Sequence, residues 1–227
     1  MASCKLCDRS GWFLSVTEDG LCKNCAPMVS MEVKQRLRVI SDSEKLAETT
    51  KKLDTLVSRC DVAIAYAEEL TKYEKRGIAT RDPPPSVIAQ RFRLKKDQRI
   101  LDAFKQECLD AQQQMLVATP KTKVKQLSKV LLHLRDYKGK MSNAALLGPI
   151  EQLLIAGIHD TQLNGYLDGA KRAEFKKQNK KALDLYYEAL YFLKHDEIQD
   201  SLQTKHISEI EEKIKEFERG SANKTGK

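Results

Sequence analysis

The sequence predicts a mainly α protein, with a small N-terminal zinc module carrying a β-hairpin, a long antiparallel helical hairpin and a C-terminal helical bundle. Three observations support this fold class. The 227 residues include only 10 glycines and 6 prolines, too few for the turns of a β-sandwich or barrel. Apolar residues recur at helical spacing over most of the chain. Two Cys-x-x-Cys pairs near the N-terminus form a local metal-binding pattern.

The N-terminal module is predicted from its four cysteines. Cys4 and Cys7 form one pair, and Cys22 and Cys25 follow after 14 intervening residues. Each pair brings two thiolates together, and two pairs supply the four ligands of a tetrahedral zinc site. Four unrelated thiols, or an iron or redox site, are the alternatives, and the absence of a βαβ pattern favours zinc. Because the protein supplies all four ligands, we expect one structural Zn²⁺ per chain.

The segment between the pairs indicates a hairpin. Residues 12–16 (Trp-Phe-Leu-Ser-Val) are strand-like, and residues 17–20 form a turn that ends at Gly20. Helical periodicity begins at Val29, so the order is knuckle, hairpin, knuckle and helix. This order resembles the treble-clef class of zinc module, as in LIM-type fingers, over about residues 4–40. So small a module depends on its metal, since structural zinc contributes about 10–16 kcal/mol. We place this domain at 1–40.

The next part, 41–118, is expected to be a long helical hairpin. Residues 29–76 contain no proline or glycine, and apolar residues from Leu53 to Leu70 follow coiled-coil spacing. A proline-rich turn at 77–85 ends this helix. Ser86 caps a second helix that continues to about Val117. Two cysteines on the apolar stripes are expected to be core residues rather than ligands: Cys60 and Cys108.

Residues 119–219 are expected to form a helical bundle that starts at a Thr119-Pro120 cap. The formal net charge of +8 lies in residues 86–140, which hold 13 Lys/Arg against 5 Asp/Glu, whereas the remainder holds 27 of each. A clustered excess is a stronger partner signal than a diffuse one, and a face that is only solvated is the alternative. The candidate partner-binding residues in this stretch are Lys121, Lys125 and Lys129, which form a row at helical spacing. The preceding helix adds five basic residues: Arg91, Arg93, Lys95, Lys96 and Arg99.

The bundle from about 160 carries a spacing of aromatic and small residues. Tyr166, Ala170, Ala182, Tyr186 and Ala189 resemble one tetratricopeptide unit, and the same stretch is similar to the microtubule-interacting-and-transport helical bundle. The resemblance implies two closely packed helices and protein recognition, with Tyr187 and Tyr191 on another face as candidate partner-binding residues. Packing of these two tyrosines against a last helix, through Ile207 and Ile210, is the alternative. Residues 220–227 are polar, and we expect a disordered tail.

The sequence predicts a non-enzymatic adaptor or assembly subunit. It contains no phosphate loop, dinucleotide fingerprint, HExxH or nucleophile elbow, and its four histidines are scattered, each expected at the surface or a helix end. The alternative is a nucleic-acid-associated protein that binds phosphate non-specifically through the basic face of 86–140. We expect a protein partner, allow self-association, and expect no membrane span and a cytoplasmic location. The order of the three parts resembles that of bacterial proteins with no assigned activity, which implies architecture only.

Overall fold

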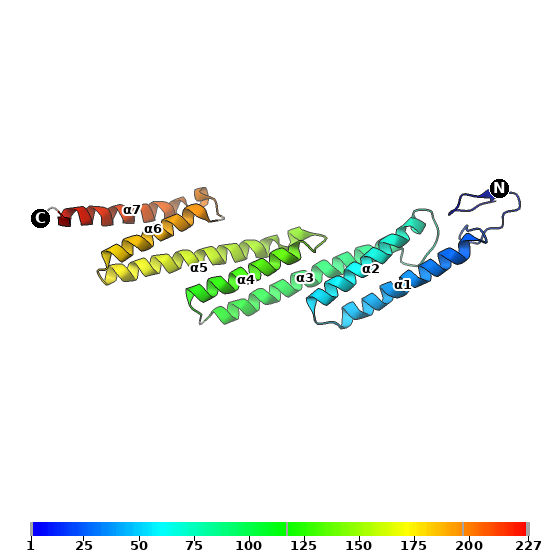
Figure 1. The fold of residues 1–227 in the computed structure, drawn as a ribbon, viewed down its shortest axis with the longest axis horizontal. Coiled ribbons are helices and arrows are strands. Elements are labelled where there is room, and N and C mark those ends of the chain that lie inside the picture. The colour runs from blue at the N-terminus through cyan, green and yellow to red at the C-terminus, as the bar shows by residue number, and fades with distance from the viewer. Residues whose placement is uncertain (1, 117, 197, 226–227) are drawn as a thin grey trace. The chain divides into compact units, whose positions relative to one another are not determined.

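The computed structural model describes residues 2–116, 118–196 and 198–225, and it confirms a mainly α fold with a small N-terminal sheet (Figure 1). The chain forms two compact units. One comprises Met1–Phe104 and Tyr137–Leu146, and the other comprises Lys105–Asp136 and Leu147–Lys227. This division by packing differs from the three sequence segments, because the N-terminal module shares a core with the helices that follow it.

The N-terminal module contains a two-residue antiparallel ladder between β1 (Ala2–Ser3) and β2 (Ser10–Gly11). The strands therefore enclose the first cysteine pair. The strand expected at 12–16 is wrong in its first residues, since Trp12 and Phe13 lie in a turn and Val16 makes a single bridge to Cys22. The turn at 17–20 is confirmed. Gly20 has φ +77° and donates a 2.8 Å hydrogen bond to Thr17 O.

The first long helix is divided, which the sequence analysis did not predict. Helix α1 (Cys25–Thr49) ends before an extended Thr50, and α2 (Leu53–Glu74) begins after an extended Lys52. Thr50 Oγ1 accepts a 3.2 Å hydrogen bond from the Lys52 N–H. Hydroxyl side chains that bond to nearby main-chain groups compete with helical bonding. The Thr50 side chain therefore supports a break between the helices, and α1 and α2 pack as an antiparallel pair.

Helix α3 (Pro85–Met115) follows the predicted proline-rich turn, which the structure confirms. Its start is held by Glu74, whose carboxylate accepts hydrogen bonds from Ser86 N–H (2.9 Å) and Ser86 Oγ (2.5 Å). The core of this unit joins residues of all three helices, among them Ile40, Leu56 and Phe92. Cys60 is fully buried in it, as expected, whereas Cys108 is only partly buried. Val117, the expected helix end, lies outside the described residues.

The second unit is built from paired helices. Helix α4 (Pro120–Lys138) starts at the predicted cap, where Thr119 Oγ1 accepts from Thr122 N–H at 3.4 Å. After η1 (Ala144–Leu147), α5 (Gly148–Phe175) packs against α6 (Asn179–His195), and α6 packs against α7 (Asp200–Thr225). Helix α7 enters the segment for which a tail is expected, and residues 226–227 lie outside the described residues. Over the residues described, none of the helices combines the length and apolarity that crossing a bilayer requires.

Candidate metal centre

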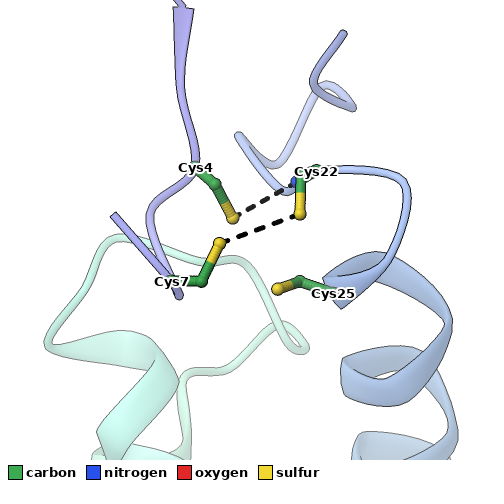
Figure 2. A group of neighbouring side chains, drawn as sticks. All are labelled: Cys4, Cys7, Cys22 and Cys25. Atoms are coloured by element: carbon green, nitrogen blue, oxygen red, sulfur yellow. Dashed lines mark hydrogen bonds between the residues drawn. The ribbon is translucent and has the colours of Figure 1, made fainter. Parts of the chain in front are cut away.

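The four predicted ligands come together at the start of α1. Cys4 follows β1, Cys7 precedes Asp8 in its left-handed turn (φ 59°), Cys22 follows the Gly20 turn, and Cys25 is the first residue of α1. All four Sγ atoms lie within 4.8 Å of one another, and all four cysteines are free (Figure 2).

The spacing of the sulfur atoms suits a four-coordinate metal ion. Cys7 Sγ and Cys22 Sγ are 3.9 Å apart. A tetrahedron with metal–sulfur bonds of about 2.3 Å has an edge of about 3.8 Å. A disulfide, by contrast, would bring two sulfur atoms to about 2.05 Å. Three of the cysteines are buried and Cys7 is exposed, so the cluster sits at the edge of the core.

Main-chain N–H groups prepare the cluster for a cation. The N–H groups of Cys7 and Cys22 donate hydrogen bonds to Cys4 and lower the pKa of its thiol to about 6, and the Cys22 N–H lies 3.3 Å from Cys4 Sγ. The Cys25 N–H likewise lowers the pKa of Cys22. Hydrogen bonding to Cys22 and burial raise the pKa of Cys25 to about 12. Without a cation, the cluster therefore keeps a proton on Cys25.

The first cysteine pair is fastened to the end of α2. Arg76 Nη1 donates to the carbonyl oxygens of Leu6 (2.5 Å) and Lys5 (3.1 Å), and Lys5 Nζ donates to Gly77 O at 2.6 Å. A divalent ion held by four thiolates carries a formal charge of −2. Lys5 and Arg76 place two positive charges beside the first pair and offset this charge.

Sequence reasoning missed an exposed aromatic pair in the loop between the two cysteine pairs. Trp12 is 85% exposed and Phe13 is fully exposed, and both lie in the turn after β2. Trp12 is the single tryptophan of the chain. The signal was present in the sequence, because a 14-residue loop bounded by metal ligands has too few apolar residues to bury two large rings.

The predicted basic face is only partly available. Four basic residues of α3 pair with acidic residues of α1 and α2, so they join helices instead of facing a partner. The pairs are Arg91–Glu44 (2.7 Å), Arg93–Glu68, Lys95–Glu48 (3.3 Å) and Lys96–Asp61 (2.7 Å). On α4, Lys121, Lys125 and Lys129 are exposed, and the described part of the chain offers them no ion pair.

The C-terminal tyrosines divide between core and surface. Tyr186 is buried with Ala182 and Ala189, whereas Tyr187 is 44% and Tyr191 66% exposed. Tyr187 meets the last helix through its hydroxyl, which donates to Glu218 Oε1 at 2.5 Å.

The surface or helix-end position expected for His159 is wrong, because its ring is buried. Nε2 of His159 lies 2.7 Å from Gln203 Oε1 and 3.1 Å from Asp196 Oδ2. The residues that surround it are far away in the sequence, so periodicity within α5 gave no signal of this cluster.

Comparisons with protein-family models, curated proteins and solved structures find no match to this chain.

Proposed function

We propose that this protein is a non-enzymatic interaction adaptor or assembly subunit in which one structural zinc ion orders an N-terminal docking module. Cys4, Cys7, Cys22 and Cys25 would hold the ion. Zinc is favoured over other metals because it takes four thiolates in a tetrahedron and needs no further ligand. The order of knuckles, ladder and helix supports a treble-clef-like module, and six free cysteines favour a reducing, cytoplasmic setting.

The observation that carries the adaptor function is the exposure of Trp12 and Phe13 in the loop that joins the two cysteine pairs. Large aromatic side chains are costly to leave in water and are enriched among residues that dominate binding energy. The turn that bears them follows β2, which pairs with β1, and the Leu14 N–H donates to Gly11 O at 3.4 Å, so the backbone of this turn is ordered before docking. Packing of Ala170, Ala182 and Ala189 between α5 and α6 further supports a tetratricopeptide-like bundle as the second part of the adaptor.

Two measurements test this function. Elemental analysis of protein purified without metal stripping should give one zinc per chain, and chelation should expose the amides of residues 2–24 to hydrogen exchange while the helices stay protected. In affinity capture followed by mass spectrometry, Trp12→Ala with Phe13→Ala should lose the partner that wild type retains. Leu132→Ala, which removes another exposed apolar side chain, is the matched control. Absence of zinc would refute the metal site, and equal capture by the double variant would refute the docking role.

A second candidate function is non-specific binding of nucleic acid, favoured by the unpaired row of Lys121, Lys125 and Lys129. Three phosphate contacts would give a shallow but measurable salt dependence, since each contact contributes about 0.9 to the slope of log affinity against log salt. Replacing the three lysines by Glu should leave the fold intact, because exposed substitutions cost within about 0.5 kcal/mol each. Absence of DNA and RNA binding at low salt would exclude this function.

A further inference from the structure

A groove on the second unit has a lining that differs in charge from the rest of the chain. It lies along α5 and α6, has a volume of about 520 Å³, and is lined by four aromatic rings and two carboxylates. No Lys or Arg is among the described residues that line it, although the chain carries a net charge of +8. The rings belong to Tyr166, Tyr187, Tyr191 and Phe192, and the carboxylates belong to Glu188 and Asp196.

The aromatic rings come from both helices, Tyr166 from α5 and the other three from α6. Tyr166 and Phe192 have ring centroids 6.0 Å apart, and Tyr191 stacks on His195 at 4.0 Å. The face of an aromatic ring carries partial negative charge and attracts cations, an arginine guanidinium in particular. A lining of aromatic rings therefore binds a positively charged planar group better than a neutral aliphatic one.

Acceptor atoms complete the lining. Glu188 is exposed and has no ion pair within the described ranges. The side chain of Asp196 is 7% exposed, and its Oδ2 accepts no hydrogen bond from any residue that the structure describes. His159 Nε2 lies 3.1 Å from that oxygen. The same nitrogen lies closer to Gln203 Oε1, at 2.7 Å. Because Asp196 Oδ2 is buried and His159 Nε2 lies 3.1 Å from it, Glu188 is the carboxylate of the groove that is open to a ligand.

His195 adds a further acceptor. Its Nδ1 lies 2.8 Å from the main-chain oxygen of Tyr191. A carbonyl oxygen only accepts hydrogen bonds, so Nδ1 carries the proton of the neutral ring and Nε2 keeps a lone pair. The groove therefore offers aromatic faces, the Glu188 carboxylate and an imidazole lone pair, all of which suit a donor-rich cation.

We propose that this groove binds an arginine side chain on a basic segment of a protein partner. The guanidinium would stack on the tyrosine rings and donate to the Glu188 carboxylate, a combination that a lysine ammonium fulfils less well. This proposal rests on the proposed adaptor function, and it names the chemistry of one partner segment. The residues of the groove are far in sequence from Trp12 and Phe13 of the N-terminal module, so the two surfaces are tested separately.

The test uses the full chain and a fluorescein-labelled Gly-Gly-Arg-Gly-Arg-Gly-Gly peptide in an anisotropy titration. A peptide with citrulline in place of both arginines keeps the shape and removes the charge. We expect the arginine peptide to bind at least about tenfold more tightly than the citrulline peptide. We also expect Glu188→Gln and Tyr191→Ala each to weaken its binding by about tenfold.

Matched controls assign binding to the groove. Asp168→Asn removes an exposed charge of α5 outside the groove and should change the affinity less than twofold. Trp12→Ala with Phe13→Ala should bind the peptide like wild type, so loss of the metal-module function and loss of groove binding are distinguishable. Equal binding of the citrulline peptide, no saturable binding of the arginine peptide, or unchanged affinity in both groove variants would each overturn the proposal. Thermal melting of every variant checks that the fold is retained.

Discussion

Arg76 Nη1 donates a 2.5 Å hydrogen bond to the main-chain oxygen of Leu6, a residue 70 positions earlier in the chain. The bond joins the first cysteine turn to the end of α2, and a second bond from the same nitrogen reaches Lys5 O. Arg76 thereby holds the N-terminal module to the helices, in addition to the covalent connection through the chain.

Removal of that partner should weaken metal binding. Arg76→Ala should lower zinc affinity by about 10-fold or more, the effect expected when an outer-shell residue that orients ligands is lost. Competition with a chromophoric chelator measures the affinity. Arg38→Ala, which removes an exposed arginine of α1, should leave it unchanged. Equal zinc affinities of the Arg76→Ala and Arg38→Ala variants would show that the cysteine side chains are oriented without Arg76.

Zinc binding should release protons in a pattern set by the individual thiols. At pH 7 Cys4, with a pKa of about 6, is mostly ionised and has little proton to lose. Cys25, with a pKa of about 12, must lose its proton to become a ligand. Calorimetric titration in two buffers of different ionisation enthalpy should therefore show at least one proton released per zinc. As the pH falls through 6, protonation of Cys4 should steepen the loss of affinity. A heat of binding independent of buffer at pH 7 would contradict this prediction.

The contact between α1 and α2 should weaken in acid. Hydrogen bonds from Lys72 (2.5 Å) and Tyr73 (2.5 Å) hold the pKa of Glu32 below its usual value. A lowered folded pKa gives stability that is present above the ordinary pKa and is lost as pH falls through the folded one. Glu32→Gln should cost about 1–2 kcal/mol at pH 7 and less at pH 2. Urea unfolding at both pH values measures this, with Asp42→Asn as the exposed control. An equal loss of unfolding free energy at both pH values would show that Glu32 stabilises the contact through packing and not through its charge.

Adjacent tyrosines of α6 should differ sharply in their contribution to stability. Tyr186 is 3% exposed and donates to Glu174, so Tyr186→Ala should cost about 3–5 kcal/mol. Tyr187→Ala with Tyr191→Ala should cost within about 1 kcal/mol in total, because both rings are largely exposed. Thermal unfolding compares the two. A large loss in the double variant would place these rings in the core and remove the basis for the groove.

Local chemistry was predictable from the sequence, whereas pairing between distant segments was not. The Cys-x-x-Cys spacing, the turn at Gly20 and the Thr119-Pro120 cap depend on a few neighbouring residues, and each was located correctly. Ion pairs such as Arg91–Glu44 depend on which helices pack together. The basic stretch therefore appeared to be a free surface, although much of it joins α3 to α1 and α2.

Two further differences between the sequence-based prediction and the structure also arise from contacts between segments. The break at Thr50 interrupts a run that contains neither proline nor glycine, because hydroxyl bonding within the turn and packing of α1 on α2 outweigh propensity. The burial of His159 depends on Gln203 and Asp196, which arrive from α7 and from the end of α6. Neither neighbour is visible in the periodicity of α5.

Cys25 is both a predicted metal ligand and the first residue of α1, so a bound ion would set the rotational phase of that helix. Val29 and Val33 follow at steps of four, and both are buried, so ligand and core residues share one side of the cylinder. One residue inserted between Cys25 and Val29 would turn the thiolate by about 100° away from that side. An insertion or deletion of one residue at this junction would therefore separate the Cys25 thiolate from the side of the helix that carries the core residues.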